Sequence, residues 1–105
     1  MLTRNDVINT VKNYAQEINE AGVNLRKVIL FGSFAKGTQH EWSDIDVALV
    51  ADDFTGVGFL DRQRFSNIGI KNPYIGIEPL TFPTDYFLES DPFIEEIKKT
   101  GIEIN

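Results

Sequence analysis

Apolar residues recur at helical spacing near the N-terminus of the chain. Successive members of this set stand one or three residues apart on a single helical face, which predicts an amphipathic helix; the set comprises Val7, Ile8, Val11, Tyr14, Ala15 and Ile18. Thr3 followed by Asp6 resembles a weak capping box at the start of this helix, with Asp in place of the usual Glu. Gly22 predicts its end. We expect the apolar face to be an ordinary packing surface.

Three runs of β-forming residues follow. Residues 27–31 form a short run that Gly32 ends, which predicts a first strand. Residues 44–51 are apolar on both faces after an acidic start, a pattern typical of a strand that is buried on both sides. Residues 74–82 predict a third strand, in which Pro79 indicates pairing on only one side at that point.

The remaining segments favour short helices around a small sheet. Helical turns are predicted for residues 33–36, closed by Gly37, for 59 to about 71, interrupted by Gly69, for a short segment from Pro83, and for 93–99, with Pro92 as first residue and Gly101 as stop. Residues 102–104 are expected to add an edge strand. The sequence therefore predicts an α/β fold, a small mixed sheet of three or four strands with helices packed on it.

The composition is that of one folded unit. The 105 residues are 42% hydrophobic, enough to form a core, and we expect a single domain over residues 1–105. There is no cysteine, which excludes disulfides and thiolate chemistry. The N-terminus does not resemble a signal peptide, and no apolar run approaches the ~20 residues that span a bilayer. We therefore expect a cytoplasmic protein without membrane association.

The charge balance narrows the choice of partners. A formal net charge of −6 disfavours nucleic acid, because binding to its phosphate backbone depends on basic patches. The same charge permits a nucleotide that metal ions bridge to the protein, since bound cations invert the local electrostatics. For most of the surface carboxylates, solubility is the simpler explanation.

Asp44 and Asp46 stand two residues apart at the predicted start of a strand. That spacing points both side chains to one face, with Cα atoms roughly 6–7 Å apart. The two carboxylates repel each other, and Mg²⁺ relieves such repulsion by binding carboxylate and substrate phosphate oxygens together. Two metal ions ~3.5–4 Å apart can activate an attacking hydroxyl and stabilise a leaving pyrophosphate. Because carboxylate pairs also occur in solvated loops, this signal is weak without a second motif.

Gly32 and Ser33 provide the second motif. A glycine at a strand end lets the backbone approach a phosphate closely, and the turn that follows offers free N–H groups. The Ser33 hydroxyl adds a donor, and Lys36 can place a positive charge near the same phosphates. A Gly-Ser pair after a strand is by itself usually only a turn. Followed on the next strand by Asp44-Ile45-Asp46, it predicts a nucleotide site.

These motifs resemble the signature of a known superfamily. Residues 32–37 and 43–46 look like the signature of the DNA polymerase β-like nucleotidyltransferases, and the short chain resembles their minimal members, the MNT proteins. Residues 92–104 are also similar to the end of those proteins. The resemblance implies a nucleotidyltransferase fold and two Mg²⁺ ions at the carboxylates. It also implies a nucleotide-binding set made of Gly32, Ser33, Lys36 and Ser43.

The same resemblance implies an activity and a partner. Its members transfer a nucleoside monophosphate from an NTP, usually AMP from ATP, to a hydroxyl. Many of them pair with a small all-helical HEPN protein in toxin–antitoxin modules, where the MNT protein adenylylates a toxin tyrosine. We therefore expect a metal-dependent nucleotidyltransferase that acts as the antitoxin of a HEPN toxin.

A third carboxylate on a neighbouring strand belongs to the site of that family. Glu78 is the candidate for it here, so the predicted catalytic and metal-binding set is Asp44, Asp46 and Glu78. The family normally has Asp at this place, and the longer Glu side chain would have to retract to reach the same metal. A structural or solvated glutamate beside Pro79 is an equal alternative. Without a third ligand the protein would bind nucleotides with little turnover.

Two other functions stay open at this point. One is a nucleotidyltransferase-fold antitoxin that inhibits its partner by contact alone, in which case Asp44 and Asp46 would not matter. The other is a small-molecule nucleotidyltransferase of the aminoglycoside type, which 105 residues disfavour because they leave no room for an acceptor domain. The acceptor surface is then expected from a homo-oligomer or another protein.

Two residues near the site have two interpretations each. His40 either touches a triphosphate or, more simply, is exposed, and Trp42 either stacks on a base or joins the core.

Overall fold

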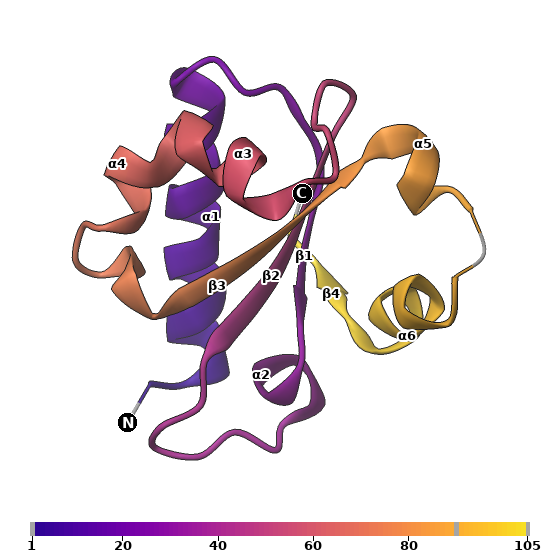
Figure 1. Cartoon of the computed structure of the whole chain (residues 1–105). Coiled ribbons are helices and arrows are strands. Elements are labelled where there is room, and N and C mark those ends of the chain that lie inside the picture. Colours follow the sequence, from indigo (N-terminus) through magenta and orange to yellow (C-terminus); the bar gives the residue numbers. More distant parts are fainter. Residues whose placement is uncertain (1, 90, 105) are drawn as a thin grey trace.

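The computed structural model describes residues 2–89 and 91–104, which fold around a four-stranded mixed sheet. The strands are β1 (Leu25–Phe31), β2 (Ile45–Ala51), β3 (Ile77–Pro83) and β4 (Ile102–Glu103). They lie in the order β3-β2-β1-β4, with β1 antiparallel to β2 and β4, and with β2 parallel to β3 (Figure 1). The predicted α/β class and the two edge strands are confirmed.

Helices cover both faces of the sheet (Figure 1). One face carries α1 (Arg4–Glu20), α3 (Gly58–Arg62) and α4 (Ser66–Gly69), with the 3-10 turns η1 (Gln63–Phe65) and η2 (Tyr74–Gly76). The other face carries α5 (Thr84–Phe87) and α6 (Pro92–Thr100). The short helix α2 (Ser33–Lys36) follows β1 at the end of the sheet. Among the described residues, no helix combines the length and hydrophobicity needed to cross a membrane.

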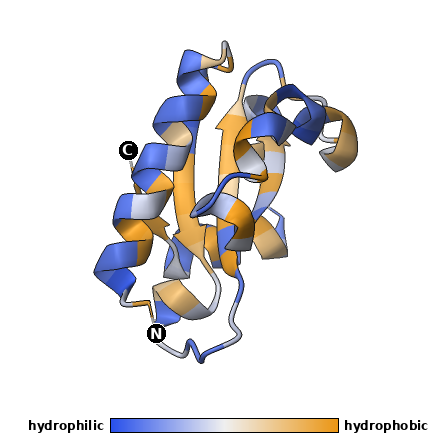
Figure 2. Ribbon diagram, turned by 90° about the vertical axis from the view of Figure 1, so that its left-hand side faces the viewer, coloured by the Kyte–Doolittle hydropathy of each residue, from blue (hydrophilic) through white to orange (hydrophobic). Residues whose placement is uncertain are grey.

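The sheet separates two apolar clusters. Because side chains alternate along a strand, Val47 and Leu49 of β2 pack with the buried face of α1, whereas Ala48 and Val50 pack with α5 and α6. Every residue from Val47 to Ala51 is buried, as the two-sided apolar pattern predicted. Figure 2 shows the apolar strands in the interior and the polar faces of the helices outside.

The helix ends follow the predicted local chemistry. The side chain of Thr3 accepts a hydrogen bond from the N–H of Asp6, and the Asp6 carboxylate accepts one from the N–H of Thr3, so the capping box is confirmed. Pro92 is the first residue of α6, and the Asp91 side chain caps that helix. Gly101 stops it, as predicted.

Two predicted elements differ from the structure because of aromatic contacts with α1. Residues 59–71 do not form one helix, because Phe65, with φ −137° and ψ 22°, leaves the helical backbone to bury its ring against Tyr14. β3 begins at Ile77 rather than at Tyr74, because the ring of Tyr74 packs 5.4 Å from that of Tyr14 and its hydroxyl donates to Glu17. In both places an aromatic contact with α1 decides the backbone.

Candidate active site

Asp46 and Glu78 are neighbours in the sheet. The parallel register of β2 and β3 pairs them directly, and on the other side of β2 the antiparallel register pairs Asp46 with Phe31 of β1. Asp46 alternates with Val47, so it faces the same side as Ala48, toward α6. Both carboxylates therefore stand near the N-terminal ends of two parallel strands.

Gly32 places the Gly-Ser turn against Asp46. Its φ is +74°, a backbone conformation that residues with a side chain rarely adopt. A Cβ at this position would lie 2.2 Å from Oδ2 of Asp46, so only glycine fits beside the carboxylate. Ser33 follows as the first residue of α2 and is half-buried. The structure thus brings together the two predicted motifs, and the backbone of one touches the side chain of the other.

Asp44 lies just before β2 rather than on it. The strand begins at Ile45, so the expectation that Asp44 starts the strand is wrong. The preceding residues turn on themselves, because the N–H of His40 donates to Oγ of Ser43 at 2.8 Å and the N–H of Ser43 donates to the carbonyl of His40 at 3.0 Å. Ser43 therefore shapes the loop that delivers Asp44 to the site.

One surface groove contains all three predicted carboxylates. It has a volume of about 660 Å³, and its lining residues are Phe31, Asp44, Asp46, Arg62, Glu78, Pro79, Leu80 and Phe93. Asp46 is half-buried, whereas Asp44 and Glu78 are exposed. Burial raises the pKa of Asp46, and the negative charges of Asp44 and Glu78 raise it further. The groove thus concentrates negative charge around Asp46.

The donor chemistry of the groove fits a hard divalent cation. Carboxylate oxygens are the ligands that Mg²⁺ prefers, and a cation would relieve the repulsion that raises the pKa of Asp46. Within residues 2–89 and 91–104, no three His, Cys, Asp or Glu side chains are placed to hold a metal ion together. Mg²⁺ commonly needs only one or two carboxylates plus phosphates and waters. Asp44 and Asp46 are the residues that suit this role.

Lys36 is not brought into the groove. Its Nζ lies 3.3 Å from Oε1 of Glu96 on α6, and both side chains are about half exposed. The positive charge predicted for the phosphates is thus paired with a carboxylate in this structure. Its role as a nucleotide ligand stays a prediction, as do those of Gly32, Ser33 and Ser43.

Sequence reasoning missed Arg62. This half-buried residue ends α3 and lines the groove with the three carboxylates. Its guanidinium folds back over Gly58, where an added Cβ would lie 2.8 Å from Nη1. The sequence predicts only a helix over residues 59 to about 71 and carries no motif that would point to Arg62. Only the packing of α3 on β3, which no local pattern encodes, carries Arg62 there.

In the loop before β2, Trp42 is more exposed than the sequence suggested. Trp42 is 82% exposed, so the interpretation of this side chain as part of the core is wrong. The indole lies in the loop between α2 and β2 and belongs to neither apolar cluster. His40 is exposed, as expected, and its Nδ1 accepts from the N–H of Trp42 at 3.3 Å.

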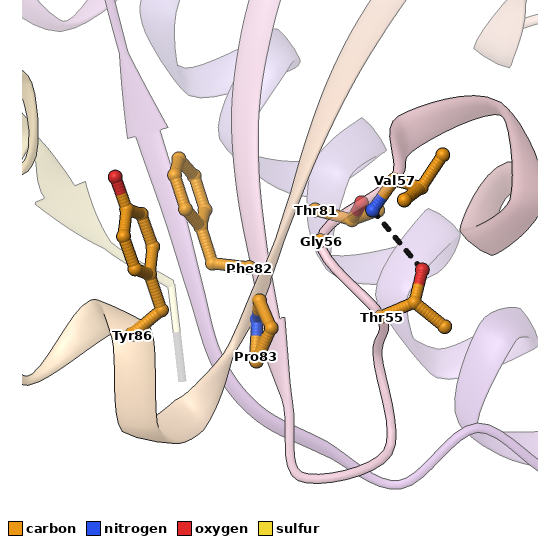
Figure 3. A pocket seen from close by; sticks show the side chains of 7 residues that line it. All are labelled: Thr55, Gly56, Val57, Thr81, Phe82, Pro83 and Tyr86. Carbon is orange, nitrogen blue, oxygen red and sulfur yellow. Dashed lines mark hydrogen bonds between the residues drawn. The ribbon is translucent and has the colours of Figure 1, made fainter.

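A second pocket lies at the opposite end of the parallel strands (Figure 3). It has a volume of about 380 Å³ and includes Phe82 and Tyr86, whose rings stack with centroids 6.5 Å apart. Its hydroxyls are already engaged: those of Thr55 and Thr81 donate to the buried carboxylate of Asp61, and Thr55 also accepts from the N–H of Val57. This pocket offers apolar surface but no group for catalysis.

The sheet, the paired carboxylates and the glycine turn define a class of protein. They are the combination expected of nucleotide-transferring α/β domains that bind phosphates through cations. The profile of the family described as "Nucleotidyltransferase domain" matches residues 8–104, and the chain belongs to that family.

Known proteins resemble the chain over nearly its whole length. It is 26% identical over 103 residues to the "Putative protein adenylyltransferase MJ0141" of Methanocaldococcus jannaschii, covering 94% of this chain and 99% of that protein. A crystal structure of a "putative nucleotidyltransferase" from Sulfolobus solfataricus has a TM-score of 0.68 and 19% identity, covering 95% of this chain and 80% of the other. A structure named "toxin-antitoxin with AMP-PNP" has a TM-score of 0.61 and 20% identity, covering 90% and 72%. These two structures share the fold.

Proposed function

We propose that this protein is a metal-dependent nucleotidyltransferase that moves AMP from ATP to a tyrosine hydroxyl of a small helical HEPN-type toxin and so acts as its antitoxin. One observation carries the proposal: Asp46 stands between Gly32 on one side and Glu78 on the other, in a groove that also contains Asp44. The relative named as a protein adenylyltransferase and the neighbour named as a toxin–antitoxin complex with AMP-PNP support the same function.

Each residue of the groove has a part in the proposed transfer. The turn at Gly32 and Ser33 binds the β- and γ-phosphates through backbone N–H groups and the serine hydroxyl. Asp44 and Asp46 would hold Mg²⁺, Glu78 would join them once its longer side chain retracts, and the bound ions would neutralise phosphate charge. The Glu78 carboxylate accepts the proton of the acceptor hydroxyl. The acceptor oxygen then bonds to the α-phosphorus as the bond to pyrophosphate breaks.

The groove that contains the carboxylates is open to solvent. Asp44 and Glu78 are exposed, and the groove is an open feature of the surface rather than an enclosed cavity. A docked protein supplies the positioning that such an open site lacks, because holding both reactants together replaces a costly bimolecular encounter. The open groove therefore favours a protein acceptor over a free small molecule.

Intact-mass spectrometry of the partner tests the proposed transfer. The protein is incubated with ATP, Mg²⁺ and a small helical HEPN-type protein that forms a complex with it, and we expect this partner to gain one adenylyl group. Asp44→Asn should abolish this gain while the complex still forms, because an amide is a poor ligand for a hard cation. Asp52→Asn is the matched control, since Asp52 is an exposed carboxylate beyond the far end of β2 that pairs with Arg26 at 3.3 Å.

The possible results separate the competing functions. An unmodified partner in a stable complex would contradict the transfer and favour inhibition by contact alone. A modified small molecule beside an untouched partner would favour the small-molecule alternative. Loss of transfer in Asp52→Asn as well as in Asp44→Asn would mean that the effect of the first substitution is not specific to the groove.

A further inference from the structure

The carboxylates of the groove lie between two different surfaces. The strand order places β1, with Gly32 at its end, on one side of Asp46, and it places the edge strand β3, with Glu78 and Pro79, on the other side. Arg62 belongs to the β3 side, because α3 packs on β3 and because Arg62 and Pro79 together also line a smaller cavity near Ile77. The Gly-Ser turn therefore lies on the β1 side of Asp46, and Arg62 lies on its β3 side.

In an in-line displacement, the leaving pyrophosphate and the attacking acceptor occupy opposite sides of the groove. The attacking oxygen and the leaving group lie on opposite sides of the phosphorus atom in such a reaction. If the leaving pyrophosphate rests on the turn at Gly32 and Ser33, the acceptor must approach from the β3 side. On that side the groove is lined by Glu78, by Pro79 and Leu80, and by Arg62.

Arg62 is a cation with free binding capacity. Among the described residues that line the groove it carries the only positive charge, and it forms no salt bridge within residues 2–89 and 91–104. The neighbouring Arg64, two residues further along, is by contrast paired with Asp53 at 3.1 Å. The guanidinium of Arg62 offers a planar fork of donors that matches a carboxylate in bidentate geometry.

We propose that Arg62 recognises the acceptor protein, by binding a carboxylate on the segment that presents the acceptor hydroxyl. This inference rests on the proposed transfer to a protein, and it adds the feature that the acceptor must carry: an acidic residue next to its hydroxyl. The nucleotide is not the expected partner of Arg62, because the proposed phosphate site at Gly32 and Ser33 lies on the β1 side of Asp46.

Peptide binding tests this role without requiring catalysis. Two synthetic peptides each contain one tyrosine, flanked by glutamates in the first and by glutamines in the second. Their affinities are measured by calorimetry in the presence of Mg²⁺ and AMP-PNP. We expect the unmodified protein to bind the acidic peptide about tenfold more tightly, the size expected for one charge-assisted hydrogen-bonded pair.

Variants assign the preference to one side chain. Arg62→Gln should remove the preference for the acidic peptide and leave the affinity for AMP-PNP unchanged. Arg62→Lys should retain part of the preference, because it keeps the charge but loses the fork. Arg64→Gln is the matched control and should bind like the unmodified protein, since Arg64 does not line the groove.

Several results would overturn the inference. These are equal affinity for the two peptides, no binding of either peptide, a preference that survives Arg62→Gln, or a loss of AMP-PNP affinity in Arg62→Gln, which would instead make Arg62 a phosphate ligand. The peptide-binding assay tests the role of Arg62, and the mass assay tests the proposed transfer, so one proposal can be wrong while the other holds. If the partner is adenylylated but the peptides bind equally well, only the role of Arg62 is contradicted. If the peptide preference depends on Arg62 but the partner is not adenylylated, only the proposed reaction is contradicted.

Discussion

At the scale of single residues, Gly32 carries two constraints at once. Its positive φ disfavours any side chain, and its Cα faces Oδ2 of Asp46 with no space for another atom. We predict that Gly32→Ala destabilises the fold by more than the ~1–2 kcal/mol that the left-handed conformation alone costs. It should also weaken AMP-PNP binding, because Asp46 must move. Urea unfolding and calorimetry measure the two effects.

Gly22→Ala is the control for this prediction. Gly22 also has a positive φ, of +103°, but an added Cβ there would meet nothing within 4 Å. The substitution should therefore cost the conformational part alone and leave nucleotide binding unchanged. Equal losses of stability in the two variants would mean that the contact between Gly32 and Asp46 has no energetic consequence.

The carboxylate of Asp46 is predicted to lower stability at neutral pH. Its pKa is raised in the folded state, so folding disfavours the ionised form, and this cost disappears as the pH falls through the folded pKa. Asp46→Asn should therefore raise the Tm at pH 7 while it abolishes transfer, and the gain in Tm should shrink toward acidic pH. Thermal unfolding across this range checks the sign. A lower Tm at pH 7 would contradict the prediction.

The sequence predicted some of these residues better than others. The proximity of Gly32 and Asp46 could be anticipated, because a strand, a turn and the next strand form a local unit. Glu78 could be placed beside them only by assuming that the third strand is their neighbour. Arg62 could not be found, because its position depends on a helix that packs across the edge of the sheet, and no spacing in the sequence encodes that packing.

At the scale of elements, the buried carboxylate of Asp61 connects α3 by hydrogen bonds to β3 and to the loop before the helix. Asp61 is 1% exposed and accepts hydrogen bonds from the N–H and hydroxyl of Thr55, the N–H of Gly56 and the hydroxyl of Thr81 on β3. Burial raises the pKa of Asp61, but these hydrogen bonds more than offset it, so the pKa lies below its ordinary value. The carboxylate therefore fixes the helix that ends at Arg62.

We predict that Asp61→Asn destabilises the protein by about 2–4 kcal/mol, because an amide cannot accept all four bonds and leaves donors unsatisfied. The lowered pKa means that the contribution of Asp61 is fully present above the ordinary pKa, near 4, and is lost as the pH falls through the folded pKa. The gap in unfolding free energy between the two proteins should hence narrow below about pH 4.

Asp53→Asn is the control for Asp61, because Asp53 forms only an exposed pair with Arg64. It should change the unfolding free energy by less than about 0.5 kcal/mol. A gap between the unmodified protein and Asp61→Asn that stays constant from pH 7 to pH 3 would contradict the assigned role of the ionised carboxylate.

Elements whose ends are set by local chemistry were predictable. The capping box at Thr3, the proline at the start of α6 and the glycine at its end are encoded within a few residues. The segment from Gly58 to Gly76 was not predictable to the same degree. There, short helices and 3-10 turns are arranged by the contacts of Phe65 and Tyr74 with α1, which is far away in the sequence.

At the scale of the whole molecule, the net charge of −6 and the carboxylate groove both oppose a triphosphate. Nucleotide binding should therefore depend on a cation. We predict that AMP-PNP binds about tenfold or more tightly with Mg²⁺ than with a chelator. Without Mg²⁺, added NaCl should improve binding, because it screens the repulsion. Calorimetry measures both, and equal affinity with and without Mg²⁺ would contradict the assignment of the carboxylates.

The exposure of Trp42 has an optical consequence. It is the only tryptophan of the chain, and its indole is already in water when the protein is folded. Its fluorescence emission should thus shift little on unfolding and would be a poor reporter of folding. Since the loop that carries it ends at Asp44, the same indole should lose contact with water when a partner covers the groove. A blue shift on mixing, in a protein whose denaturation gives almost none, would report docking alone.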